Sequence, residues 1–245
     1  MQHRRAAAAG VALLVAGWAG AAIGSAAGAS TTASTTTSTT AGGPLTKADY
    51  ELLKGISSES KVGSVRIVGT IKQGSTTLTF NLLVNGDGEG GGTFVQDGST
   101  IQLKRVGTLL YFDAPTTFWS HHGTKAQAKK YGGKWIEVSA LTSQFQSFDQ
   151  FLNASDLVTA VFSGHTTPLS VSKPVTYEHH KVVIVTDTVV HNGKATTGEL
   201  YLADQRAALA YKILTKGPKL NDTIVFSHYG KAVSISTPPE PINLS

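Results

Sequence analysis

The chain has 245 residues, a formal net charge of +5 and no cysteine. Its length suits one folded domain behind a leader segment. Without cysteine it can form neither disulfides nor a cysteine-linked lipid anchor, so burial of apolar side chains must stabilise the fold. Its lysines and arginines are scattered, which excludes the dense basic patch of a nucleic-acid-binding protein; we expect no nucleic-acid partner.

The N-terminus has the pattern of a signal peptide. Arg4 and Arg5 precede a charge-free run of small and apolar residues, Ala6–Ala29, which ends in the small-x-small sequence Ala27-Gly28-Ala29. We expect residues 1–29 to be a signal peptide that is cleaved near Ala29. The alternative is an uncleaved anchor, since about 20 residues suffice to span a bilayer. Both readings place the rest of the chain outside the cytoplasm, extracellularly or in the cell envelope.

Residues 30–44 form a Thr/Ser-rich tract with no apolar residue larger than alanine. Such a tract cannot bury enough surface to offset the entropy of ordering it. We therefore expect a flexible linker over residues 30–44 and one folded domain over residues 45–245.

The folded part begins with a helix and continues with strands. Thr46 and Asp49 predict a capping box, followed by an apolar stripe at helical spacing over Leu45, Ala48, Leu52, Leu53 and Ile56. Alternating apolar residues then predict strands at 65–71, 78–84, 93–95, 100–106 and 108–113, with a glycine-rich turn at 86–92. Short turns between these strands indicate an antiparallel meander.

The middle of the chain carries aromatic residues at helical spacing, at 115–128 and 147–162, around a short strand at 134–138. Further strands are predicted at 181–190, 198–202, 207–214, 222–228 and 232–236, with Asn192-Gly193 as a hairpin turn. The order is strands, helices, strands, without regular βαβ alternation. We predict an α+β fold: a curved antiparallel β half-barrel whose concave face is covered by helices and encloses a hydrophobic cavity.

Catalytic and metal-binding patterns are weak. Two S-x-x-K sequences, Ser58–Lys61 and Ser170–Lys173, lack the motifs that accompany them in Ser hydrolases. His121-His122 and His179-His180 are adjacent pairs, and adjacent residues on a strand point to opposite faces. Acidic residues are spread singly. We expect no enzymatic activity, no catalytic residue, no metal and no cofactor; an esterase is the least favoured of three hypotheses.

Three stretches together resemble a known family: Thr108–Pro115 with Phe118-Trp119, Tyr131–Val138, and Val225–Pro239 with its closing pattern YGK-x-V-x-I-x-x-PP. In order and spacing they are similar to the LppX/LprG/LprA group of actinobacterial envelope lipoproteins, which have a LolA-like fold. The resemblance covers the chain from about Leu45 onward. This chain departs from the family in one respect, because most members carry a lipobox cysteine after the signal and this chain has none.

The resemblance implies a non-catalytic carrier of an acyl-chain ligand, such as a lipid, lipoglycan or glycolipid. The partners expected are this ligand, a membrane surface or a membrane transporter, and we expect a monomer. The alternative is a sensor or scaffold domain that contacts a membrane protein. The apolar pattern and aromatic helices indicate these cavity-lining residues: Phe80, Leu82, Phe94, Leu110, Phe112, Phe148, Phe151, Leu152 and Phe162.

Overall fold

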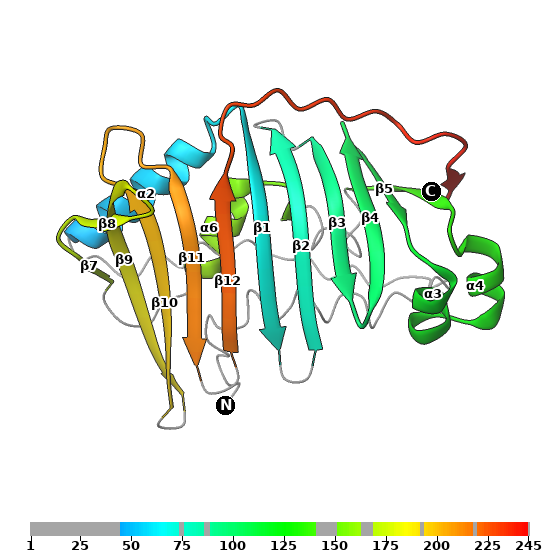
Figure 1. The fold of residues 1–245 in the computed structure, drawn as a ribbon, viewed down its shortest axis with the longest axis horizontal. Helices are drawn as coiled ribbons and strands as arrows, with labels where there is room; N and C mark the ends of the chain where they lie inside the picture. The colour runs from blue at the N-terminus through cyan, green and yellow to red at the C-terminus, as the bar shows by residue number, and fades with distance from the viewer. Residues whose placement is uncertain are drawn as a thin grey trace.

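The chain folds into a large open sheet with a few helices (Figure 1). The computed structural model describes residues 45–73, 76–85, 89–140, 151–162, 169–191, 194–217 and 220–244. The strand order is β13-β6-β5-β4-β3-β2-β1-β12-β11-β10-β9-β7, with β8 also paired to β9. All pairs are antiparallel except β13 with β6. The predicted α+β class with an antiparallel sheet is confirmed.

Two meanders make up the sheet. The first contains β1 (Ser64–Gln73), β2 (Thr76–Asn85), β3 (Gly90–Gln96), β4 (Ser99–Val106), β5 (Leu109–Asp113) and β6 (Trp135–Ser139). The second contains β7 (Ser170–Val171), β8 (Val175–Tyr177), β9 (His180–His191), β10 (Lys194–Ala203), β11 (Ala210–Gly217) and β12 (Leu220–Ser227). They join where β1 pairs with β12, with Ile67 opposite Phe226.

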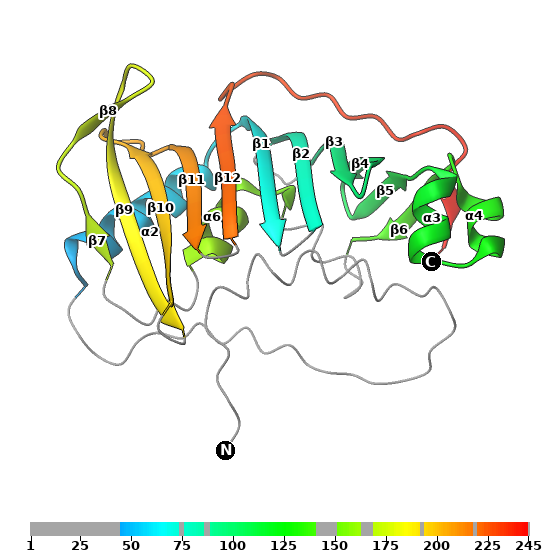
Figure 2. The same cartoon turned by 60° about the horizontal axis from the view of Figure 1, so that its bottom comes forward.

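The helices are α2 (Lys47–Glu59), α3 (Thr116–His122), α4 (Lys125–Tyr131) and α6 (Ala154–Phe162). α2 and α6 contact each other, and both lie on the same side of the sheet (Figure 2). We call this side the inner face. No helix in the described part of the chain is long and apolar enough to span a membrane.

Two helix predictions need correction. The segment predicted as one helix at 115–128 is divided into α3 and α4, because Thr124 forms a capping box with Gln127 and starts a new helix. In the segment predicted at 147–162, α6 begins at Ala154, where the Asn153 side chain accepts a hydrogen bond from the Ser155 amide (3.0 Å). The predicted capping box at Ser147 lies outside the described residues.

Two extended segments also differ from expectation. Gly90, Gly91 and Gly92 belong to β3 rather than to a turn, because neighbouring backbones approach closely there: a Cβ on Gly92 would lie 2.0 Å from the Asn81 carbonyl oxygen. The strand predicted at 232–236 is an extended strap without ladder pairing, which runs along the ends of β1–β5 (Figure 1). The strap ends in β13 (Ile242–Asn243), which pairs with β6.

Candidate functional site

The inner face of the first meander is a continuous apolar surface. On β2, Leu78, Phe80, Leu82 and Val84 are buried while the residues between them are more exposed. β5 continues the surface with Leu110 and Phe112. Strand alternation places these side chains on one face.

Three phenylalanines, which we call the phenylalanine triad, connect this face to the segment before α6. The ring centroid of Phe80 lies 5.8 Å from that of Phe94, and the Phe151 centroid lies 5.0 Å and 5.2 Å from those of Phe80 and Phe94. Both contacts of Phe151 are edge-to-face, a favoured geometry for aromatic pairs. Phe151 therefore caps the two sheet phenylalanines from outside the sheet.

A glycine on the neighbouring strand makes room for the triad. Gly69 on β1 stands opposite Phe80 on β2, and a Cβ at Gly69 would lie 2.2 Å from the Phe80 ring. The absent side chain leaves the space that the outer end of the Phe80 ring occupies. Position 69 shares its face with Ile67 and Ile71.

Seven of the nine predicted lining residues are described, and all seven are buried. Their exposed fractions are at most 4%, for Phe80, Leu82, Phe94, Leu110, Phe112, Phe151 and Leu152. Phe148 lies outside the described residues, and Phe162 lies in α6 with its side chain undescribed. The structure thus brings the seven into one apolar core. The cavity itself stays a prediction.

Of a second aromatic group, the Trp119 cluster, only Phe112 was predicted as part of the site. The cluster consists of Phe112, Phe118, Trp119 and Tyr131, with centroid distances from Trp119 of 5.9, 5.7 and 5.4 Å. Among the residues that the structure describes, the buried Trp119 Nε1 donor has no hydrogen-bond partner. A buried donor of this kind costs about 1–3 kcal/mol. Phe118 and Trp119 in the sequence indicated aromatic packing, but nothing local indicated an unpaired donor.

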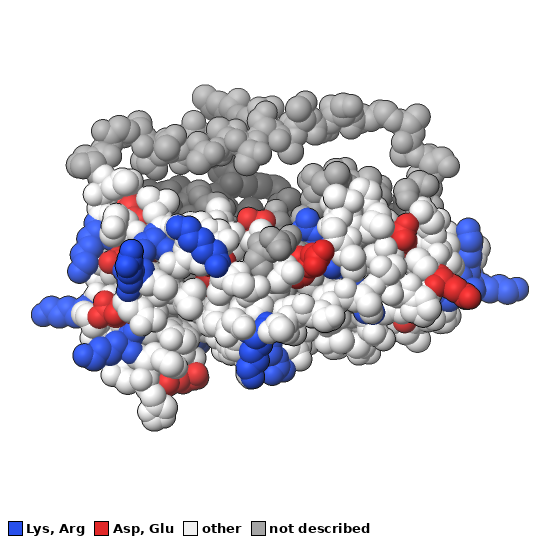
Figure 3. Space-filling model, turned by 90° about the horizontal axis from the view of Figure 1, so that it is seen from above, with Lys and Arg blue, Asp and Glu red and all other residues white. Residues whose placement is uncertain are grey.

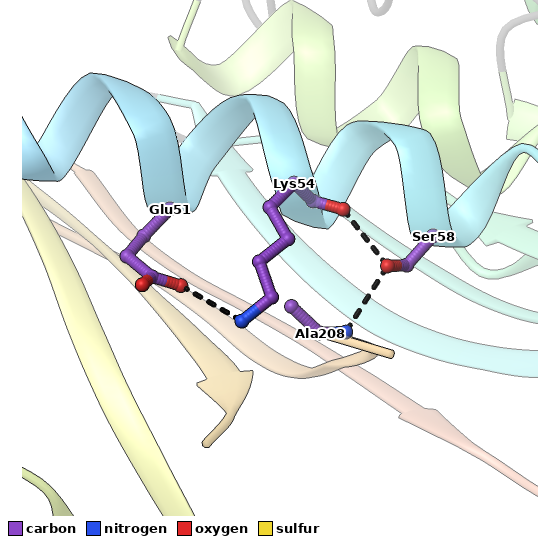
Figure 4. A network of polar contacts seen from close by, with 4 residues as sticks. All are labelled: Glu51, Lys54, Ser58 and Ala208. Carbon is purple, nitrogen blue, oxygen red and sulfur yellow. Dashed lines mark hydrogen bonds and ion pairs between the residues drawn. The ribbon is translucent and has the colours of Figure 1, made fainter. Parts of the chain in front are cut away.

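Helix α2 is fixed to the second meander by side chains near its C-terminal end. The Ser58 hydroxyl accepts a hydrogen bond from the Ala208 amide (3.0 Å) and donates one to the Lys54 carbonyl oxygen (2.8 Å; Figure 4). The Glu59 carboxylate accepts a hydrogen bond from the Ala210 amide (2.7 Å). Gly55 lets the helix approach Leu202 of β10.

Glu59 is a buried acid in this apolar setting. Burial raises the pKa of its carboxyl from 4.5 to about 7, partly offset by hydrogen bonds from the Ala210 amide and the Tyr229 hydroxyl. Burial and the neighbouring Glu59 raise the pKa of Tyr229 well above its ordinary value. Sequence reasoning missed this pair, because its members are 170 residues apart.

Within the described residues, no group of three His, Asp or Glu side chains could hold a metal ion. In the described part of the chain, the site consists of a wide apolar surface, an aromatic cap and the buried indole donor of Trp119. Such a surface can bind an apolar chain by burial and can orient one polar group.

Comparisons with known proteins identify solved structures of similar architecture. No protein-family model and no curated protein sequence matches the chain. The structure is similar to that of LprF from Mycobacterium bovis, with a TM-score of 0.50 and 15% identity over 80% of this chain and 99% of that chain. It is also similar to the Mycobacterium tuberculosis lipoprotein LppX, with a TM-score of 0.48 and 10% identity over 76% of this chain and 97% of that chain. The likeness to LprF shows a shared fold.

Proposed function

We propose that this chain is a non-catalytic carrier that binds the acyl chain of a lipid, lipoglycan or glycolipid on the inner face, in the cell envelope. The observation that carries the proposal is the continuous apolar inner face capped by Phe151. The shared fold with LprF is compatible with it.

The free energy of burying an acyl chain can exceed that of the Phe151 ring which it would replace over Phe80 and Phe94. Displacement of Phe151 loses two aromatic contacts of about 0.5–1.5 kcal/mol each and the burial of its ring, which contributes about 1.5–3 kcal/mol. An acyl chain that buries about ten methylenes gains about 8 kcal/mol, at about 0.8 kcal/mol per methylene. A long acyl chain can therefore displace Phe151 from Phe80 and Phe94 and still bind usefully.

The two tryptophans of the folded part allow a test of where the chain binds. Trp119 contacts Phe112 on the inner face, and Trp135 contacts Lys104 on the opposite, outer face. Brominated stearic acid, which quenches nearby indoles, is titrated into two full-length variants that also carry Trp18→Phe. Trp135→Phe leaves Trp119 as the reporter, and Trp119→Phe leaves Trp135.

We expect saturable quenching of Trp119 and little quenching of Trp135. Equal quenching of both would indicate adsorption to the surface, and no quenching of either would contradict the proposal. Native mass spectrometry of the purified protein should also detect a co-purifying lipid.

The N-terminal boundaries belong to the same proposal. We propose export with a signal peptide over residues 1–29 and a linker over residues 30–44. Mass spectrometry of the mature protein should find a first peptide that begins at Ser30. A mature chain that retains Met1 would indicate an anchored form instead.

A further inference from the structure

Helix α2 and the residue just before its N-cap carry large apolar side chains that the fold leaves in solvent. Leu45, Tyr50 and Leu53 are 68%, 62% and 50% exposed, the three highest values among the large apolar side chains described. The sequence pattern predicted that Leu45 and Leu53 belong to the buried stripe of this helix, and the structure corrects that prediction.

The geometry of α2 explains the exposure. The helix buries Ala48, Leu52, Gly55 and Glu59. At about 100° per residue, positions 50 and 53 point away from these residues by about 100–180°. Packing of Gly55 on Leu202 fixes this orientation, so Tyr50 and Leu53 face away from the core.

Lysines accompany these exposed apolar side chains. Lys47 and Lys54 are seven residues apart, which places them on the same side of the helix after two turns, and Lys61 follows just beyond the helix end. Two nearby acidic side chains already have partners. Asp49 accepts a hydrogen bond from the Thr46 amide in the capping box (2.8 Å), and Glu51 forms an ion pair with Lys54 (3.4 Å). Figure 3 shows many Lys and Arg side chains toward the end of the molecule that carries α2 and β7–β11.

We propose that this face of α2, defined by Tyr50, Leu53 and Lys47 on the helix and by Leu45 and Lys61 just outside its two ends, docks onto a bilayer that contains anionic lipid. Apolar and aromatic residues beside lysines are typical of helices that lie in the membrane interface. Tyrosine favours the headgroup level, where its ring is buried and its hydroxyl stays hydrated. The proposal rests on the proposed function, since a lipid carrier must meet a bilayer to exchange its ligand.

A bilayer fits this face better than a protein partner. Stable protein interfaces bury about 800 Å² on each partner with close shape complementarity. Two side chains on a 13-residue helix and one just before it provide far less than that, whereas a fluid interface needs no complementary shape. The helix also begins where the chain joins residues 1–44, whose apolar run predicts contact with a membrane during export.

The chain has no cysteine, so one introduced cysteine gives a unique label in the full-length protein. An environment-sensitive NBD dye is attached at Leu53→Cys and, as the matched control, at Val95→Cys. Val95 is 36% exposed and lies on the outer face of the sheet. Both labelled proteins are mixed with vesicles of phosphatidylcholine and phosphatidylglycerol, with and without nitroxide-labelled lipid.

We expect NBD emission at position 53 to rise at least twofold and to be quenched by the nitroxide lipid, with no change at position 95. Lys47→Gln together with Lys61→Gln should weaken this response at least threefold and reduce its dependence on salt. Equal responses at both positions, or none at position 53, would overturn the proposal. An emission rise at position 53 that depends on protein concentration without vesicles would assign the face to a second copy instead.

A double variant, Tyr50→Ser with Leu53→Ser, distinguishes the carrier proposal from the membrane-docking proposal. Its binding of fatty acid is measured by quenching with brominated stearic acid. We expect this double variant to bind the fatty acid normally while it loses binding to vesicles. If the unmodified chain binds no fatty acid, the carrier proposal fails, and the labelling result decides membrane docking independently.

Discussion

The hydroxyl oxygen of Tyr229 lies 2.9 Å from Oε1 of Glu59 and 2.5 Å from the carbonyl oxygen of Ala210. One hydroxyl hydrogen can be donated to only one of these acceptors. Oε1 of Glu59 also accepts a hydrogen bond from the Ala210 amide (2.7 Å), so Glu59 and Tyr229 both contact the backbone of Ala210 on β11. Burial favours the neutral form of Glu59 and raises its pKa to about 7, although the hydrogen bonds from Ala210 and Tyr229 act in the opposite direction.

This arrangement predicts a stability that falls as pH rises. The pKa of Glu59 is about 7 in the folded protein against 4.5 as the ordinary value, so the folded state binds more protons between these two values. The contribution of Glu59 is fully present below about pH 4.5 and lost above about pH 7; it amounts to about 3 kcal/mol at about 1.4 kcal/mol per pKa unit. Urea unfolding from pH 4.5 to 8 measures it.

Glu59→Gln should remove most of this pH dependence, because the amide keeps the shape of the side chain without a titrating proton. Glu51→Gln, on the same helix but with a partly exposed side chain, serves as control and should leave the slope unchanged. Identical pH profiles for Glu59→Gln and the unmodified chain would contradict the assignment.

Ser58→Ala should destabilise the protein by about 1–3 kcal/mol. The substitution removes the acceptor of the Ala208 amide, and a buried donor left unpaired pays its desolvation cost. Ser57→Ala changes an exposed residue next to it and should alter the free energy of unfolding by less than about 0.5 kcal/mol. Equal effects of the two substitutions would exclude a specific role of Ser58 in fixing α2.

Gly69→Ala should destabilise by about 1–3 kcal/mol through overpacking, because the new methyl group would collide with the Phe80 ring. Gly198→Ala is the matched control: Gly198 also lies in a strand, and a Cβ added there would meet no atom within 4 Å. Combining Gly69→Ala with Phe80→Leu should recover part of the loss. Thermal unfolding of the unmodified chain, Gly69→Ala, Phe80→Leu and the double variant tests whether the two positions are coupled.

Trp119→Phe should change the stability of the ligand-free protein little, since relief of the unpaired Nε1 donor opposes the loss of packed volume. It should weaken binding of an acyl ester about 2- to 10-fold, the value of one hydrogen bond. Binding of a plain alkane of equal length should change less. Trp135→Phe, on the outer face, provides the control in both titrations.

Local sequence patterns determined the elements of this protein. Alternation over Leu78–Val84 depends only on which residues are apolar, so the strand and its buried face could be predicted from the sequence. The capping box of Thr46 and Asp49 is a contact over three residues and was equally readable. The same patterns placed seven described lining residues in the core, because strand geometry decides which side chains share a face.

The tertiary structure alone decided how the elements meet. Leu53 was predicted to be buried, but the orientation of α2 is set by Gly55 against Leu202 on a distant strand, and it leaves Leu53 in solvent. The contact between Glu59 and Tyr229 joins residues that are far apart in the chain. The space at Gly69 that the Phe80 ring fills also depends on two different strands. Hydrophobicity determines that a residue favours burial, whereas the close packing of distant elements determines which apolar residues are buried.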